Sequence, residues 1–115
     1  MTDEEKTNEI IKEVTLTLHN AINCDRMFKG CSVLTDVDLT LPHATTCMYM
    51  FWWCPNLTNV KLNAPVCKSY FEMFQGSTSL KSAELNLPQA DNCQSMFGAC
   101  TSLVSVNLNI PNATM

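Results

Sequence analysis

Cysteine and histidine are the residue types in this chain that could bind a metal or carry out nucleophilic chemistry. The sequence has 7 Cys and 2 His among its 115 residues. The four cysteines that could be drawn into a zinc site are Cys24, Cys31, Cys47 and Cys54. Structural zinc sites usually take ligands in pairs spaced about two to four residues apart, whereas both of these pairs are separated by seven. We therefore predict no metal ion and no other cofactor.

The two histidines, His19 and His43, offer little for catalysis. A Cys–His nucleophile needs the two side chains close together and a third group that orients the base. Each histidine falls beside the position where a predicted strand ends, and polar surface residues are expected there. We therefore predict no catalytic residues and a protein that is not an enzyme.

All of these residues fall within a 23-residue repeat that spans most of the chain. The dipeptide Met-Phe begins at positions 27, 50, 73 and 96, and leucines follow at the same interval at 34, 57, 80 and 103. A fixed period between about 20 and 50 residues marks a solenoid. We expect an N-terminal helical cap over 1–13 and a solenoid over 14–115, with repeats at about 19–41, 42–64, 65–87 and 88–110 and an incomplete last one.

Each repeat divides into two halves. Val37, Leu39 and Leu41 alternate with polar residues, which is typical of a strand with one buried face, and Pro42 ends that strand. The apolar residues at 44, 47, 50, 51 and 54 have helical spacing. The sequence therefore predicts an α/β repeat: a short solenoid with a parallel β-sheet on one face and short helical turns on the other.

The repeat also sorts the cysteines into columns of equivalent positions. One column holds Cys24, Cys47 and Cys93, with Tyr70 at the remaining position; a second holds Cys31, Cys54 and Cys100, with Ser77; Cys67 shares a third with Ala44 and Ala90. Replacement by Ala, Ser and Tyr indicates that cysteine acts here as a small core residue, and we expect reduced, buried thiols.

A disulfide between Cys24 and Cys47 is an alternative, because stacked repeats would bring their Cα atoms to about 4.8 Å. In-register side chains point the same way, which suits that bond poorly. A thiol-based or metal-binding role for the protein is a distant alternative.

The phrase Met-Phe-x-Gly-Cys-x-x-Leu-x-x-Val-x-Leu-x-Leu-Pro-x-Ala-x-x-Cys resembles the BspA-type leucine-rich repeat family. Its matches begin at 27–31, 50–54, 73–77 and 96–100, and the resemblance covers 14 to 114. It implies a leucine-rich solenoid that is displayed on a surface and binds or adheres to other proteins or cells. It implies no shared catalytic or cofactor residues.

Composition excludes several other classes. With 46% hydrophobic and 16% charged residues, the chain is not of a disordered type. A net charge of −4 lacks the basic footprint of a nucleic-acid binder, and no apolar run reaches the roughly 18 residues of a membrane span. The acidic N-terminus has no apolar stretch typical of a signal peptide. We therefore expect a cytoplasmic chain as it stands, while the resemblance implies a surface or secreted protein if the chain is a fragment.

Candidate binding residues are those that break their column by being large and apolar. Trp53 stands where other repeats have Gly30 and Gly76, and the full set is Met48, Tyr49, Trp52, Trp53 and Phe71. We expect an exposed patch that recognises a protein or surface ligand of unknown identity. The alternative is that either Trp folds back over a gap in the core.

A competing function is structural. The sequence ends just after a strand around 106–110, and such a strand would show an unpaired edge. A homodimer through this C-terminal edge, a partner that adds a strand, or a longer array would each cover it.

Overall fold

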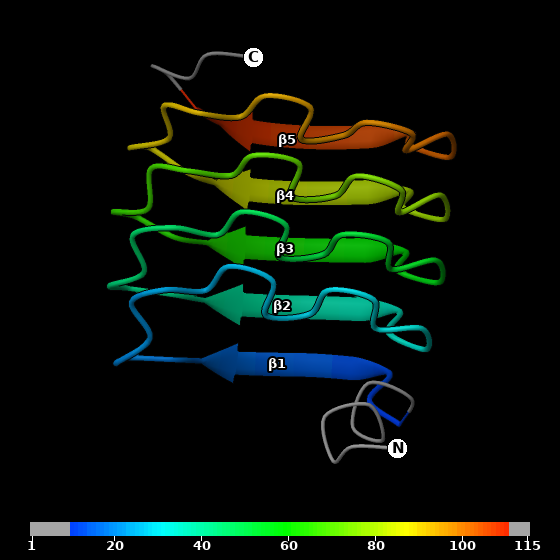
Figure 1. Ribbon diagram of the computed structural model, residues 1–115, viewed down its shortest axis with the longest axis horizontal. Coiled ribbons are helices and arrows are strands. Elements are labelled where there is room, and N and C mark those ends of the chain that lie inside the picture. The colour runs from blue at the N-terminus through cyan, green and yellow to red at the C-terminus, as the bar shows by residue number, and fades with distance from the viewer. Residues whose placement is uncertain (1–9, 111–115) are drawn as a thin grey trace.

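The computed structural model describes residues 10–110 as a stack of five parallel strands joined by long returning segments (Figure 1). The strands are β1 (Glu13–Thr17), β2 (Asp36–Thr40), β3 (Asn59–Asn63), β4 (Ser82–Asn86) and β5 (Ser105–Asn109). They lie in one sheet in the order β1-β2-β3-β4-β5, which is their order in the sequence. Each strand with its returning segment forms one turn of the solenoid, called a rung below.

The register of the sheet follows the 23-residue repeat. Val14 pairs with Val37, Val37 with Val60, and Val60 with Ala83, so every partner lies 23 residues away. One-residue slippage would turn the buried face of a strand toward solvent. The apolar columns therefore hold all five strands in the same register.

The returning segments are not helical, so the prediction of short helical turns is wrong for residues 10–110. Every second backbone N–H in these segments bonds to a carbonyl of the next rung. Arg26 N–H donates to the Met48 carbonyl at 2.9 Å, and Phe28 N–H donates to Met50 at 2.9 Å. Alternate N–H groups close only tight turns, such as Lys29 to Arg26 at 3.1 Å.

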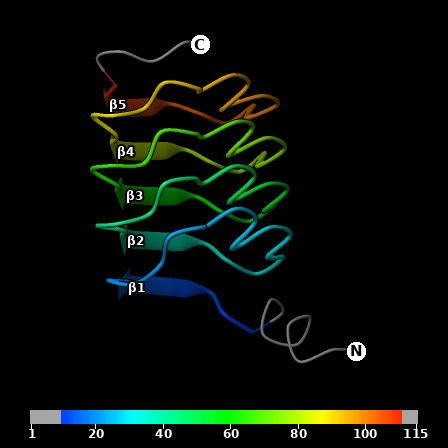
Figure 2. The same ribbon diagram turned by 60° about the vertical axis from the view of Figure 1, so that its left-hand side comes forward.

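Backbone conformation also excludes a helix there. Two positions in each returning segment have positive φ, for example Arg26 at 61° and Gly30 at 70°. Such residues reverse the local winding, so no run of i→i−4 bonds forms. The result is a chain that bends at regular intervals, and Figure 2 shows these bends stacked from rung to rung.

The core consists of ladders of identical residues, as the repeat predicts. Phe28, Phe51, Phe74 and Phe97 stack with centroid distances of 5.4, 5.3 and 5.5 Å and nearly parallel rings. The buried leucines include Leu34, Leu57, Leu80, Leu39, Leu62 and Leu85. Each rung thus buries its apolar face against its neighbours rather than within itself.

The predicted helical cap over 1–13 lies largely outside the described residues, which start at Ile10; Glu13 already begins β1. At the other end, the predicted strand is present as β5, and residues 111–115 are outside the described part. No helix within residues 10–110 is long and apolar enough to cross a membrane.

Candidate functional site

Four aromatic side chains on the returning segments of the second and third rungs form one contact cluster, here called the aromatic patch: Tyr49, Trp52, Trp53 and Phe71. Tyr49 meets Phe71 edge to face at 5.6 Å and Trp52 at 6.5 Å, and Trp52 meets Trp53 at 5.7 Å. These T-shaped geometries are the favourable ones for aromatic pairs. The patch is therefore a continuous surface of packed rings.

The patch is less exposed than the sequence predicts. Trp53 is 49% exposed, whereas Tyr49, Trp52 and Phe71 are half-buried. On other rungs, most residues in these columns are polar or small. On the second and third rungs they are large rings, and the rings cover one another. Of the two tryptophans, Trp53 is thus the exposed one.

Met48, the fifth predicted binding residue, is half-buried in the turn that carries Tyr49. The Asp25 carboxylate accepts hydrogen bonds from the Met48 N–H at 2.8 Å and from the Thr46 hydroxyl at 2.7 Å. This pair of bonds anchors the turn to the preceding rung.

Two residues of the patch hold a strained backbone conformation that recurs in the same columns of the other rungs. Tyr49 and Trp53 have φ of 58° and 53°, in the left-handed region. That region costs a residue with a side chain roughly 1–2 kcal/mol. Gly30 and Gly76 occupy the Trp53 column on the neighbouring rungs with φ of 70° and 79°, so Trp53 holds a conformation that suits glycine.

The absence of a side chain at Gly76 makes room for the Trp53 ring. A Cβ atom added to Gly76 would lie 2.5 Å from Trp53 Cδ2 and 2.7 Å from Cε2. The same addition at Gly30 would meet nothing within 4 Å. Trp53 therefore rests on the backbone of the next rung in its own column.

Two cations border the patch, and the sequence reasoning did not include them. The Arg26 guanidinium lies 4.9 Å from the Tyr49 ring centre, and the Lys29 ammonium lies 5.0 Å from the Trp52 ring centre. Arg26 shares the Tyr49 column and Lys29 shares the Trp52 column. Stacking by 23 residues therefore sets each cation over the aromatic ring of the next rung.

The Trp52 indole N–H is buried without a hydrogen-bond partner, the one such side-chain atom found within residues 10–110. An unmet buried donor costs about 1–3 kcal/mol. The patch therefore keeps Trp52 in place despite a local loss of stability.

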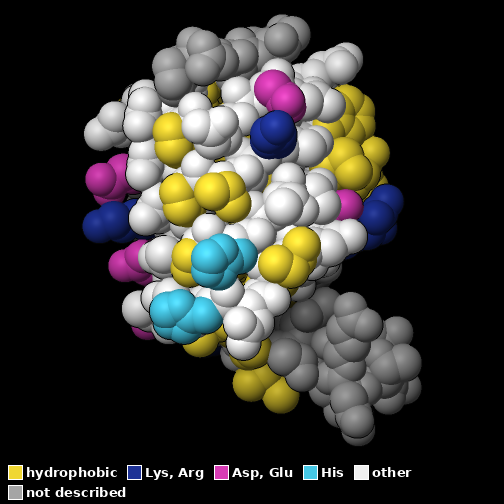
Figure 3. All heavy atoms as spheres, turned by 90° about the vertical axis from the view of Figure 1, so that its left-hand side faces the viewer, with side chains coloured by type: hydrophobic (Ala, Val, Ile, Leu, Met, Phe, Trp, Pro, Cys, Tyr) yellow, Lys and Arg dark blue, Asp and Glu magenta, His cyan; other side chains and the backbone are white. Residues whose placement is uncertain are grey.

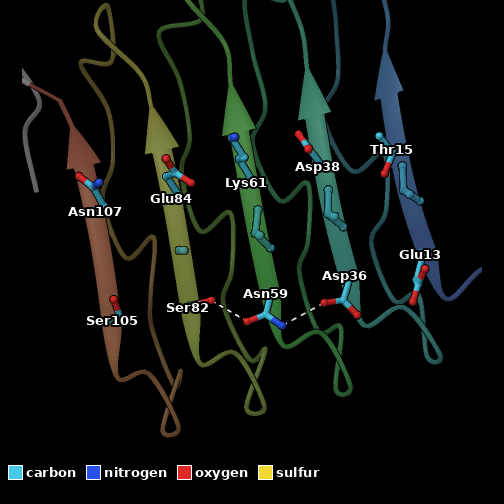
Figure 4. A pocket seen from close by; sticks show the side chains of 14 residues that line it. Glu13, Thr15, Asp36, Asp38, Asn59, Lys61, Ser82, Glu84, Ser105 and Asn107 are labelled. Carbon is cyan, nitrogen blue, oxygen red and sulfur yellow. Dashed lines mark hydrogen bonds between the residues drawn. The ribbon is translucent and has the colours of Figure 1, made fainter.

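The outer face of the sheet carries a shallow groove of about 630 Å³, lined by side chains from all five strands (Figure 4). Its polar side chains bond along the sheet: Asn59 donates to Asp36 at 2.9 Å, and Ser82 donates to Asn59 at 2.6 Å. Hydrogen bonds from Asn59 and then Thr35 lower the pKa of Asp36. Because these polar groups hydrogen-bond to one another, they are less available to a ligand. We therefore take the aromatic patch, and not the groove, as the candidate binding site.

The second cysteine column has a specific structural role. Cys54 donates to the Phe28 carbonyl at 3.0 Å, and Cys100 donates to Phe74 at 3.2 Å. Ser77, which replaces cysteine, makes the same bond to Phe51 at 2.8 Å. The column thus requires a small side chain that can donate a hydrogen bond, a property that serine and cysteine share.

The structure does not bring the two histidines together with the cysteines. Within residues 10–110, no group of three or more His, Cys, Asp or Glu side chains is placed to hold a metal ion. His19 and His43 are exposed at the turns that follow the strands (Figure 3), whereas the nearest cysteines along the chain, Cys24 and Cys47, are buried.

Comparison with known proteins agrees with this architecture. A family model described as BspA type Leucine rich repeat region (6 copies) matches residues 7–115. No curated protein and no solved structure matches the chain. The match spans nearly the whole sequence and includes all five stacked strands. The chain therefore belongs to the BspA-type leucine-rich repeat family.

Proposed function

We propose that this protein is a non-enzymatic binding module that recognises another protein through its aromatic patch. The observation that carries the proposal is Trp53, a large ring that is 49% exposed in a left-handed backbone conformation. Glycine serves that position on neighbouring rungs without strain. A residue that lowers stability and remains half-exposed is typical of a functional position.

The surroundings of Trp53 suit a protein partner. Trp, Tyr and Arg are the residues most enriched among the energetic hot spots of interfaces, and the patch brings Trp52, Trp53 and Tyr49 together beside Arg26. The ring contacts restrict the rotamers of these side chains before binding, so little conformational entropy is lost on association.

The test uses the fact that the only 2 tryptophans of the chain both lie in the patch. Peptides selected from a display library on the immobilised protein are titrated against the free protein, and tryptophan emission is followed with acrylamide as quencher. We expect bound peptides to shield Trp53 from the quencher. The Trp53→Gly variant, which takes the glycine of the neighbouring rungs, should lose at least ten-fold in affinity.

The matched control is Ala99→Gly, because Ala99 occupies the Trp53 column on another rung, has a similar φ of 57° and lies outside the patch. It should leave affinity unchanged. Selected peptides that bind Trp53→Gly as well as they bind the wild type would refute the proposal.

A second candidate function is structural self-assembly, favoured by the apolar side chains at both terminal rungs. Val104, just before β5, and Val106, within β5, are exposed, and so are Leu16 and Ile22 on the first rung. Burial of these side chains between copies would stabilise an assembly. Light scattering across a range of concentrations, with reductant present, tests this candidate, and a constant monomer mass would exclude it.

A further inference from the structure

Three buried thiols meet in the core where the second and third rungs pack together. Cys47 and Cys67 share a hydrogen bond with an Sγ–Sγ distance of 3.3 Å, and both side chains are fully buried. Cys24, which is also buried, hydrogen-bonds Cys47 from the first rung. In the second cysteine column, by contrast, Cys54 and Cys100 also bond to backbone carbonyls.

Cys67 and Cys47 come from different columns, so their contact differs from the stacking of equivalent residues. Cys67 occupies the column of Ala44 and Ala90, and it reaches Cys47 across 20 residues of sequence rather than 23. Equivalent residues on stacked rungs have parallel side chains, which suit a disulfide poorly. The offset of Cys67 brings its sulfur to the Cys47 sulfur from a different position along the rung.

We propose that Cys47 and Cys67 are a disulfide-forming pair, which a disulfide oxidant such as oxidised glutathione converts to a bond that ties the second rung to the third. Both sulfurs already lie at 3.3 Å, and a disulfide brings them to about 2.05 Å. Cys47 comes two residues before Tyr49. The bond would therefore tether the turn that carries the aromatic patch.

The reaction balances as ordinary thiol–disulfide exchange. The Cys67 thiolate attacks one sulfur of oxidised glutathione, which forms a mixed disulfide and releases one glutathione thiolate. The Cys47 thiolate then attacks the Cys67 sulfur, the protein disulfide forms, and the second glutathione leaves. Two protons pass from the cysteines to the two released glutathione molecules, and the electron pair goes with them.

Two features of the chain support this order of events. The hydrogen bond shared by Cys47 and Cys67 lowers the pKa of the Cys67 thiol and contributes to a raised pKa of Cys47, which makes Cys67 the thiolate that attacks first. Val66 and Lys68 on either side of Cys67 are exposed, so a local opening of this turn suffices to admit the oxidant.

Peptide mapping tests the pairing in the full-length protein. The reduced chain is incubated at low concentration with oxidised glutathione, alkylated and digested with trypsin. Cleavage after Lys12, Arg26, Lys29, Lys61 and Lys68 places Cys24, Cys47 and Cys67 in separate peptides, 13–26, 30–61 and 62–68. We expect peptide 62–68 linked to 30–61, with fragmentation spectra that assign the link to Cys47, and two fewer titratable thiols than in the reduced chain.

The bond should also raise the melting temperature by several degrees, reversibly with dithiothreitol, because it restricts the unfolded chain. Cys67→Ala carries the residue found at this position on other rungs and should abolish both the link and the shift. Cys93→Ala is the matched control and should retain both.

Three results would overturn the proposal. They are a link between 13–26 and 30–61, which would mean Cys24–Cys47; glutathione adducts without an internal link; and no oxidation under conditions that oxidise the urea-unfolded chain.

Discussion

Substitution of Gly76 by alanine measures how firmly the Trp53 ring rests on the next rung. The new Cβ would lie 2.5–2.8 Å from three ring atoms of Trp53, so the ring must move away. Gly30→Ala is the matched control, because Gly30 has the same kind of backbone, with φ of 70°, and open space at the Cβ position.

The expected magnitudes follow from two contributions. Alanine in a left-handed conformation costs about 1 kcal/mol relative to glycine, and this is all that Gly30→Ala should lose. Trp53 is 49% exposed, so its packing buries on the order of 100 Å². At about 25 cal/mol per Å² this is worth up to about 2.5 kcal/mol. Partial displacement of the ring should add about 1–2 kcal/mol to the cost of Gly76→Ala.

The assay is urea unfolding followed by circular dichroism, with both glycine variants made in the wild type and in Trp53→Ala. Without the Trp53 ring, the cost of Gly76→Ala should fall to that of Gly30→Ala, which gives a coupling free energy of about 1–2 kcal/mol. Acrylamide should also quench Trp53 more strongly in Gly76→Ala. Equal costs for the two glycine variants in the wild type would refute the placement of Trp53 on Gly76.

Three further predictions concern single side chains of the core and of the aromatic patch. Ser77→Cys should change the free energy of unfolding by less than about 1 kcal/mol because it keeps the donor to the Phe51 carbonyl, whereas Ser77→Ala should cost about 2 kcal/mol; equal losses in urea unfolding would contradict this role. Trp52→Phe removes the unpartnered indole N–H, so thermal melts should show a loss of stability of about 1 kcal/mol or less. Truncation of a buried aromatic side chain typically costs about 3–5 kcal/mol. Burial raises the pKa of Cys93 and of Cys100 from 9.0 to about 11; the folded chain then holds these protons more tightly than the unfolded chain, so stability is retained below pH 9 and falls as pH rises toward 11. Urea midpoints across that range measure the fall, which should be shallower in Cys93→Ala.

The strands and their register could be predicted because the same residues produce both. Val37, Leu39 and Leu41 alternate within one strand, and their equivalents recur 23 residues later. Burial of every such column requires each strand to lie on the next in the same register. The Phe ladder follows from the same repetition.

The returning segments could not be predicted in the same way. Apolar spacing at 44, 47, 50 and 51 matches a helix, yet a solenoid bend buries the same positions. The choice depends on where the N–H groups of residues such as Arg26 and Phe28 find acceptors, and the neighbouring rung supplies them. Spacing within one segment contains no information on that neighbour.

The candidate site was predicted in outline. The column rule selected Met48 together with four aromatic residues, and the structure brings the rings of Tyr49, Trp52, Trp53 and Phe71 into contact. It did not select Arg26 or Lys29, which are ordinary residues for their columns. They join the patch only because stacking sets them over aromatic rings.

The repeat length, the family, the strand positions and the ladders of the core follow from the order of the residues, because a period of 23 residues leaves one register that buries all the apolar columns. The bends of the returning segments, the exposure of Trp53 and the contact between Cys47 and Cys67 follow only from how the rungs pack. Each of these depends on contacts between different columns of neighbouring rungs. The strength of such contacts depends on the direction of the side chains and the partners of the backbone, and a pattern of residue types does not specify either.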